Sequence, residues 1–483
     1  MQLFDSRRDG SRCRFAAPSF GKARWLVLWL LGLLFALPAF AQLPDITAGQ
    51  KPSPEEPVEA VPTIFPHPEG RYWISGQMNF IFQANAPFYA RYSGAQSFKP
   101  VYATTSSRIL TLYTGFQINN SMELLADAES ASGLGLSQVH GIAGFPDLDS
   151  VKDSDLTAAP YLARLMFHAV IPLGPTKTEN ASNPLSTFSE LPTRRLEIRI
   201  GKFSMTDFFD TNAVGSDSHL QFMNWSVDQN GGWDFTADPR GYTWGIYTEY
   251  QSPAWGFRFA EALFPGPNLG DGLEWNLRKG NTSSFEFELH RGFLKKKDGI
   301  IRVLSYVNNG NMGTYQYANE QFLNGTVTTP DLADHPEWVT TKYGFGLNFE
   351  QVLTNDLVLY GRFGWNNGKT ESWSFTEVDQ VFSGGLGAAG RMWGRHFDRA
   401  GIAFVSNGIT SEHAHYLGFG GLGLMLGDGK LSYARENLME AYYTAHIWRG
   451  LFLGPDLQLI VHPGYNSVRG PVFVPSFRFH VEL

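Results

Sequence analysis

The sequence predicts an all-β protein, a closed antiparallel transmembrane β-barrel of about 16 strands. Three observations favour this fold. The chain starts with an export signal, apolar and polar residues alternate from residue 72 to the last residue, and glycine (51 residues) and aromatic residues (14%) are abundant. After residue 41 no apolar run approaches the roughly 18 residues of a membrane-spanning helix.

The first 41 residues have the composition of a signal peptide. Six basic residues precede an apolar run, Trp25 to Leu37, and the small-x-small sequence Ala39-Phe40-Ala41 follows it. The run is shorter than the roughly 20 residues that span a bilayer as a helix, which disfavours a permanent anchor. We therefore expect residues 1–41 to be a signal peptide that is cleaved before Gln42.

Composition narrows the classes of partner. Residues 1–41 carry six basic and two acidic residues, so cleavage changes the formal net charge from −8 to −12. An acidic chain argues against nucleic acid as a partner. The one cysteine, Cys13, would be removed with the signal peptide, leaving no thiol for a disulfide or a thiolate-bound metal.

Proline separates the signal peptide from the rest of the chain. Residues 43–68 contain seven prolines and almost no periodicity. Such a segment tends to the solvated polyproline II conformation. We predict that residues 42–70 are a proline-rich periplasmic linker and that residues 71–483 are the outer-membrane barrel.

Alternation of polarity predicts the strands of the barrel. It is clearest at residues 72–82, 285–290, 343–350 and 477–483, where every second residue is apolar. Tryptophans near expected strand ends suit aromatic girdles at the membrane interfaces: Trp73, Trp244, Trp365 and Trp448. The last strand reaches the final residue, which allows a closed barrel without an edge. At roughly 25 residues per strand, residues 71–483 give about 16 strands, enough for an aqueous lumen.

Motifs of catalysis and metal binding do not fit this chain. Two GxGxxG matches, residues 385–390 and 418–423, lack the strand-and-helix context of a dinucleotide site and are better explained as glycines on barrel strands. His413 and His415 have no third ligand placed by spacing, which favours an exposed loop pair over a metal site. The calcium-loop spacing also fails from Asp228 onward. We predict no catalytic residue, no cofactor and no metal.

One stretch, residues 221–245 (QFMNWSVDQNGGWDFTADPRGYTWG), concentrates three tryptophans and three aspartates. Aromatic rings stack on the apolar faces of sugars, and charged groups hydrogen-bond sugar hydroxyls. These residue types therefore suit binding, transport or hydrolysis of carbohydrates. The same tryptophans would also serve as interface anchors or as packing within a loop.

The stretch lies in a longer segment, Gly201 to Gly245, that resembles the central part of the OprB-type carbohydrate-selective porins. Its GKF, FMNW and DPRGYTWG elements carry the resemblance, and residues 457–483 (LQLIVHPGYNSVRGPVFVPSFRFHVEL) are similar to the family's C-terminal end. His462 and Leu483 depart from that pattern, Leu483 because it replaces the usual terminal aromatic residue. The resemblance implies a 16-stranded barrel in a bacterial outer membrane, with loops folded into its lumen, that passes sugars passively. Its implied partners are sugars as permeants, outer-membrane lipid, and the barrel-assembly machinery acting through the C-terminal strand.

In such a porin the long connection at residues 204–240 is a candidate for an inward-folded constriction. Glu197 and Arg199 have the polar parity of a strand and should face the lumen, with Lys202 near the strand end. The residues that we expect to contact sugars in the constriction are Asp207, Asp210, Trp225, Trp233, Asp234 and Arg240. Pairing of Asp234 with Arg240, to hold the loop against the wall, is an alternative role for these two residues.

Two other classes of protein stay open at this point. A secreted β-rich glycosidase, built as a β-sandwich or a β-propeller, would be soluble and would need one carboxylate pair. A non-conducting structural barrel of the outer membrane would share the fold but close its lumen to solutes.

Overall fold

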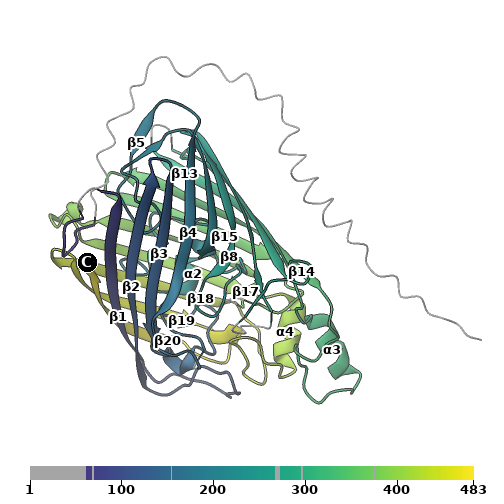
Figure 1. Ribbon diagram of the computed structural model, residues 1–483. Helices are drawn as coiled ribbons and strands as arrows, with labels where there is room; N and C mark the ends of the chain where they lie inside the picture. Colours follow the sequence, from purple (N-terminus) through teal and green to yellow (C-terminus); the bar gives the residue numbers. More distant parts are fainter. Residues whose placement is uncertain (1–60, 68–69, 154, 267–271, 295–296, 374–376) are drawn as a thin grey trace, which may run out of the picture. The chain divides into compact units, whose positions relative to one another are not determined.

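The computed structural model describes residues 61–67, 70–153, 155–266, 272–294, 297–373 and 377–483. Sixteen antiparallel strands close into a barrel, each strand pairing with the next one along the wall and the last with the first (Figure 1). This confirms the predicted fold and excludes a sandwich or a propeller. The expected signal peptide, residues 1–41, and most of the expected linker, residues 42–70, lie outside the described residues.

The barrel sheet contains strands of 8 to 17 residues. In wall order they are β1 (Tyr72–Asn85), β2 (Ala103–Asn119), β3 (Met122–Ser132), β4 (Tyr161–Pro172), β7 (Arg195–Phe203), β8 (Thr243–Gln251), β9 (Trp255–Ala262), β12 (Asn281–Leu289), β13 (Gly299–Gly310), β14 (Thr340–Thr354), β15 (Leu357–Asn366), β16 (Gln380–Ala389), β17 (Arg399–Gly408), β18 (Glu436–Trp448), β19 (Leu451–Val461) and β20 (Val472–Glu482).

The connections carry short elements of their own. Two small pairings lie outside the barrel sheet, β5 (Lys177–Glu179) with β6 (Glu190–Pro192) and β10 (Phe264–Pro265) with β11 (Leu273–Glu274). The helices are α2 (Trp225–Asp228), α3 (Tyr315–Leu323) and α4 (Ser411–Gly418), with single 3-10 turns at η2 (Leu136–Gln138), η3 (Met205–Asp207), η4 (Gly390–Trp393) and η5 (Pro463–Tyr465). Within the described part of the chain, no helix is long and apolar enough to cross a membrane.

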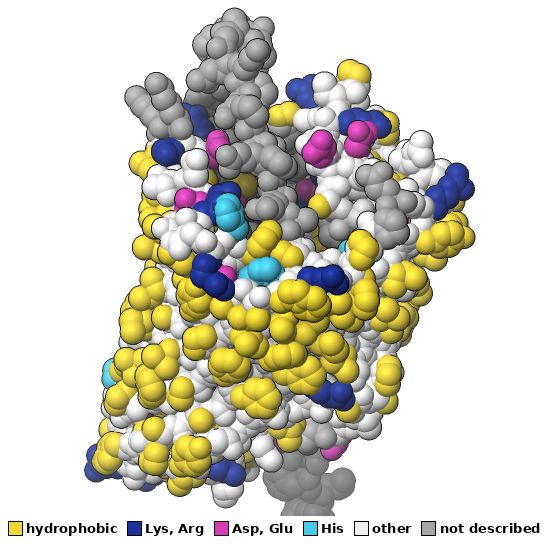
Figure 2. Space-filling view, turned by 90° about the vertical axis from the view of Figure 1, so that its left-hand side faces the viewer, with side chains coloured by type: hydrophobic (Ala, Val, Ile, Leu, Met, Phe, Trp, Pro, Cys, Tyr) yellow, Lys and Arg dark blue, Asp and Glu magenta, His cyan; other side chains and the backbone are white. Residues whose placement is uncertain are grey.

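Alternation along each strand separates an apolar outer face from a polar inner face. On β1, Ile74 and Phe82 are exposed, whereas Gln77 and Asn79 point inward and are buried. Figure 2 shows hydrophobic side chains across the middle of the barrel wall, with most charged side chains toward its upper and lower margins. Trp73 differs from the expectation: it is buried on the inner face against Tyr113, so it is not an interface anchor.

Backbone bonds at the seam close the barrel through the last residue. β1 and β20 pair in register from Gln77 opposite Glu482 to Gln83 opposite Ser476. Beyond the strand, the backbone N–H of Leu483 donates to Gly76 O at 2.8 Å. The seam therefore uses the main chain of the terminal residue, which any amino acid supplies.

The two ends of the barrel differ in the length of their connections. Turns of two or three residues join β2 to β3, β8 to β9, β14 to β15 and β18 to β19, and β1 begins and β20 ends on that side. The connections at the other end are long, up to the segment between β7 and β8. Short turns face the periplasm and long loops face outward in bacterial barrels, which orients this chain.

A substitution on the outer face tests the membrane position of the wall. Phe404 on β17 is 55% exposed near mid-strand, whereas Trp448 is 56% exposed at the end of β18. We expect Phe404→Arg to lower the free energy of unfolding by about 2–4 kcal/mol, and Trp448→Arg by about 0–1 kcal/mol. Urea titration in lipid vesicles measures both. Equal losses would contradict the assigned depths.

Candidate constriction inside the barrel

The connection from Ser204 to Tyr242 runs inside the barrel, as expected for residues 204–240. It leaves β7 through η3, forms the single helical turn α2 in the lumen, and returns to the wall at β8 (Figure 1). Asn224 begins α2, since its side chain accepts from Ser226 N at 3.0 Å. The same side chain donates to Gly144 O at 2.6 Å. It thereby ties this connection to the one between β3 and β4.

Arg362 of β15 is the central anchor of the connection. Its buried guanidinium pairs with Asp210 at 2.8 Å. It donates to the backbone oxygens of Gly215 (2.8 Å), Val227 (2.5 Å) and Asp210 (2.9 Å), and to the Ser216 hydroxyl (2.7 Å). One side chain thus satisfies carbonyls that the fold of the loop leaves without backbone partners.

Wall carboxylates satisfy the loop N–H groups in the same way. Glu440 of β18 accepts from Met223 N at 2.6 Å. Glu286 of β12 accepts from Asp210 N at 2.7 Å. Glu436 of β18 accepts from Gly144 N at 2.7 Å, so a wall carboxylate also holds the connection between β3 and β4.

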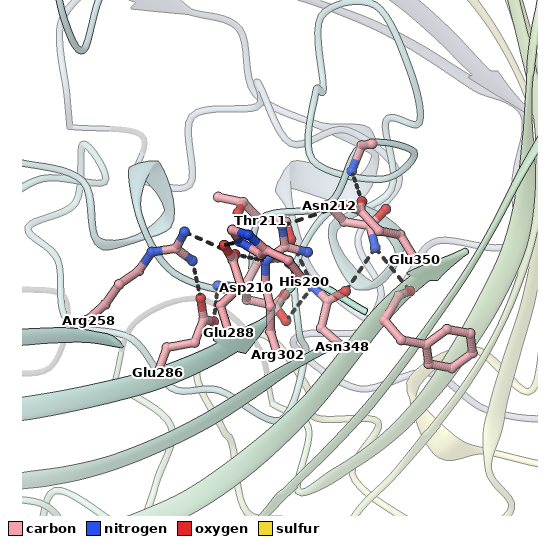
Figure 3. Close-up of polar contacts among 12 residues, drawn as sticks. Asp210, Thr211, Asn212, Arg258, Glu286, Glu288, His290, Arg302, Asn348 and Glu350 are labelled. Carbon is pink, nitrogen blue, oxygen red and sulfur yellow. Dashed lines mark hydrogen bonds and ion pairs between the residues drawn. The ribbon is translucent and has the colours of Figure 1, made fainter. Parts of the chain in front are cut away.

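A ladder of alternating charge supports the loop from the wall (Figure 3). Arg258 of β9 lies 2.5 Å from Glu286 and 3.0 Å from Glu288. Arg302 of β13 lies 2.7 Å from Glu288 and 3.5 Å from Glu350 of β14. Arg258 also lies 3.1 Å from Glu249 of β8. Each arginine thus joins carboxylates of the two strands beside its own, so the charges are paired within the wall.

Between the inserted connections and the wall lies a cavity of about 660 Å³. Its size falls in the range of about 300–1,000 Å³ for small-molecule sites. Polar and aromatic side chains of both the wall and the loops line it. Those used in the argument below are Glu129, Lys152, Tyr161, Arg164, Asp207, Asp210, His219, Trp225, Asp228, Trp233, Arg240, Tyr242, Arg302 and Glu350.

One wall of the cavity combines arginines with tyrosine rings. Arg164 of β4 holds Asp207 through two bonds of 2.8 and 2.6 Å. The Arg240 guanidinium lies 4.3 Å from the ring centre of Tyr161. The hydroxyls of Tyr161 and Tyr242 both donate to the Glu129 carboxylate, the second at 3.2 Å. Donors, acceptors and apolar ring faces therefore meet at one surface of the cavity, which is the chemistry that a sugar needs.

The three strand residues expected to face the lumen have other partners. Glu197 accepts from His168 at 2.9 Å and pairs with Arg199 at 2.8 Å; both are buried, inward-facing and outside the lining of the cavity. Lys202 lies at the strand end and pairs with Asp238 at 3.2 Å, also outside the lining. Contact of these residues with sugar stays a prediction that the geometry does not favour.

The four charged residues expected in the constriction divide into two groups. Asp207, Asp210 and Arg240 line the cavity. Asp234 does not; it pairs with Lys342 of β14 at 3.2 Å and accepts from Trp373 N. The alternative pairing of Asp234 with Arg240 is wrong, because Arg240 instead stacks on Tyr161 and donates to Thr157 O at 2.7 Å.

Both predicted tryptophans line the cavity, with most of their surface buried. Lys152 lies 4.1 Å from the ring centre of Trp225, whose Nε1 donates to Asp147 O at 3.3 Å. Trp233 is 2% exposed and packs edge-on against Phe209 at 6.0 Å. Packing of the loop thus accounts for much of both rings, and stacking on a sugar remains a prediction.

Sequence reasoning missed the strand residues that complete this surface. Glu129, Tyr161, Arg164, Arg302 and Glu350 come from β3, β4, β13 and β14. Alternation along β4 was the one signal that could have found them. Arg164 and His168, four residues apart in YLARLMFHAV, share the inner face of the strand. Nothing in the local sequence shows which inward residues meet the loop.

Two motif interpretations need correction. His413 is not in an exposed loop: it is buried in α4, 3.2 Å from Asp379, while His415 lies on the last turn of the same helix. Thr410 caps this short helix, its side chain accepting from His413 N. Gly385 and Gly387 lie on β16 as expected, but Gly418 ends α4 and residues 419–423 lie outside any strand. No group of three His, Cys, Asp or Glu in the described ranges is arranged to hold a metal ion.

Two loop groups change the electrostatics of the cavity. Burial raises the pKa of Asp228 to about 7, and the nearby Arg362 only partly offsets it. Burial would lower the pKa of His219, but the charge and hydrogen bond of Asp149, 3.4 Å away, together with the charge of Asp217, raise this pKa to about 9. At neutral pH the cavity thus holds a protonated histidine and a carboxyl at the midpoint of its titration.

A closed wall, apolar outside and polar inside, narrowed by inserted connections around a solute-sized cavity, defines a porin-type channel. The family model for "Carbohydrate-selective porin, OprB family" matches residues 107–483. The chain belongs to this family, which confirms the resemblance of residues 201–245 and 457–483. It is a carbohydrate channel of the bacterial outer membrane.

A solved structure agrees with the fold. The high-pH structure of Pseudomonas putida OprB matches with a TM-score of 0.64 and 16% identity, over 85% of this chain and 94% of that one. The low-pH structure of the same protein matches with a TM-score of 0.43 and 12% identity, over 85% of this chain and 92% of that one. The outer-membrane channel DcaP of Acinetobacter baumannii matches with a TM-score of 0.47 and 7% identity, over 85% of this chain and 97% of that one. No curated protein sequence matches the chain.

Removal of the central anchor should free the connection. Arg362→Ala removes the ion pair of Asp210 and leaves the carbonyls of Gly215 and Val227 without this donor, at a cost of about 3–5 kcal/mol for the broken buried pair. We expect a lower melting temperature and a larger, noisier single-channel conductance. Arg399→Gln is the matched control, because its pair with Asp217 is about one-third exposed. A quiet channel of unchanged conductance in Arg362→Ala would contradict the anchoring role.

Titration of Asp228 should change ion selectivity. Its carboxyl is neutral below pH 7 and charged above it, so the cavity gains a negative charge as the pH rises through about 7. We expect the permeability of K⁺ relative to Cl⁻ to rise over that interval, measured as the reversal potential in a salt gradient. Asp147, whose pKa also lies at about 7, remains in Asp228→Asn, so the difference between wild type and this variant reports Asp228. An identical step in the variant would disprove the assignment.

Proposed function

We propose that sugars pass through this cavity as neutral solutes, contacting Arg164, Asp207, Arg240 and Tyr161, and that the chain carries out no covalent chemistry on them. The observation that carries the proposal is the surface at which two arginines, a carboxylate and a tyrosine ring line one cavity of about 660 Å³. A pyranose presents hydroxyls at its edge and an apolar face, which this surface matches.

Weak binding follows from the pairing of these groups. Asp207 already accepts from Arg164, and the arginine ladder is neutralised within the wall. A sugar hydroxyl therefore uses remaining donor and acceptor positions rather than unpaired charges, so its contacts are shallow. Rapid passage requires binding of this kind, strong enough for entrance and weak enough for release.

Passive diffusion also fits the size of the chain. The 16 barrel strands and the connections between them extend from residue 72 to residue 482, and the inserted connections narrow the lumen. We infer that assembly uses the barrel-assembly machinery, which would read the β20 strand; the outward Phe477 and Phe473 would serve in place of a terminal aromatic residue.

A substitution at the arginine–tyrosine surface tests the proposal. Loss of one sugar hydrogen bond in Arg240→Gln should raise the half-blocking sugar concentration about two- to tenfold. The measurement is single-channel conductance with glucose added stepwise, alongside sugar uptake into liposomes. Lys177→Gln, in an exposed pair on β5, is the control.

Three outcomes separate the candidate functions. Sugar block that weakens in Arg240→Gln but not in Lys177→Gln supports the proposal. Conductance without any sugar block in the wild type would disprove passage along this surface. A wild-type barrel with no conductance at all would instead identify a non-conducting structural protein.

A further inference from the structure

An inserted segment also lies at the periplasmic end of the barrel. Residues 181–188 (ASNPLSTF) join β5 to β6 on the side of the short turns. Turns on that side ordinarily stay outside the lumen. Here Ser186, Thr187 and Phe188 are buried, and Leu185 reaches the lining of the cavity described above.

Thr187 fixes the segment to the inner wall. Its backbone N–H and its hydroxyl both donate to the Glu123 carboxylate of β3, at 2.9 and 2.5 Å. Its backbone oxygen accepts from Gln117 of β2 at 2.7 Å. Every polar group of this residue thus has a partner on the wall, so the inserted position is a specific one.

The neighbouring residues are held by an arranged set of wall side chains. Arg199 of β7 donates to Leu185 O. His168 of β4 packs against the Phe188 ring at 5.9 Å and is itself oriented by Glu123 (2.7 Å) and Glu197. Glu197 and Arg199, which parity predicts to face the lumen, therefore serve to hold this segment.

A glycine in the wall makes room for it. A Cβ at Gly115 of β2 would lie 2.3 Å from Thr187 Cγ2 and 3.5 Å from Thr187 Cβ. The contact at 2.3 Å is far inside van der Waals distance. The wall thus accepts the segment only where β2 carries no side chain.

We propose that residues 181–188 form a second constriction, in series with the inserted extracellular connections, which sets the upper size of the solute that reaches the periplasm. Leu185 is the residue that faces the passing solute, and Thr187 is a positioning residue that acts through Glu123 and Gln117. The part of this inference that concerns the size of sugars rests on the proposed passage of sugars through the cavity.

The test replaces residues 181–188 with two glycines, which can close the β5–β6 hairpin. If the segment narrows the exit, ion conductance rises about twofold and larger uncharged polyethylene glycols enter the lumen, because the narrower of two constrictions in series limits the flow. Raffinose uptake into liposomes relative to glucose should rise as well. Unchanged conductance and polymer cutoff in a variant that still shows heat-modifiable migration would overturn the proposal.

A disulfide gives the matched control. The 3.5 Å separation suits a Gly115→Cys/Thr187→Cys pair, because Thr187→Cys removes the Cγ2 atom that a Cβ at residue 115 would otherwise meet at 2.3 Å. The predicted mature chain has no other cysteine. Oxidised, this variant should conduct no more than the wild type, because the segment is locked against the wall. Conductance equal to that of the two-glycine variant while oxidised would contradict the constriction.

Ion conductance and polymer exclusion require no sugar, so they separate this inference from the proposed function. A larger cutoff without glucose block in any variant would uphold the constriction and reject sugar passage. Normal glucose block with an unchanged polymer cutoff in the two-glycine variant would uphold sugar passage and reject the constriction.

Discussion

The structure depends on one constraint: main-chain polar groups carried into the barrel must find partners there. An inserted connection cannot form a strand ladder with the wall, and unpaired N–H and C=O groups are costly where water is excluded. Arg362 satisfies three carbonyls, and Glu440, Glu286 and Glu436 accept from buried N–H groups. The polar inner face that an aqueous pore requires is thus also the face that holds its constriction.

The same constraint explains why so many lumen charges occur in pairs. Arg258 joins carboxylates of β8 and β12, Arg302 joins carboxylates of β12 and β14, and Arg164 joins Asp127 to Asp207. Neutralised charges offer hydrogen bonds in definite directions without the strong field of an isolated ion. A neutral sugar can exchange such bonds during passage, whereas a cavity of unpaired charges would retain ions or water instead.

Much of the fold could be predicted from the sequence, and less of the site. Parity correctly placed Gln77, Asn79, Glu197 and Arg199 on the inner face, since period-two alternation is a local property of a strand. It did not tell a residue that lines the cavity from one that anchors a segment, because that difference depends on a partner far along the chain. Asp234 illustrates the failure: Lys342, its partner, is more than one hundred residues away.

The sequence by itself determined that residues 72–482 alternate as strands, that their number suffices for a wide barrel, and that the segment from Gly201 to Gly245 carries the pattern of carbohydrate-selective porins. Local rules and short motifs carry that information. Only the tertiary structure decided that Tyr161 and Arg240 meet at the cavity, that the two tryptophans are largely packed within the loop, and that Glu197 and Arg199 hold a periplasmic segment. Those roles follow from barrel closure, which brings side chains of distant strands to face one another across the lumen. No local sequence pattern encodes the distances between them.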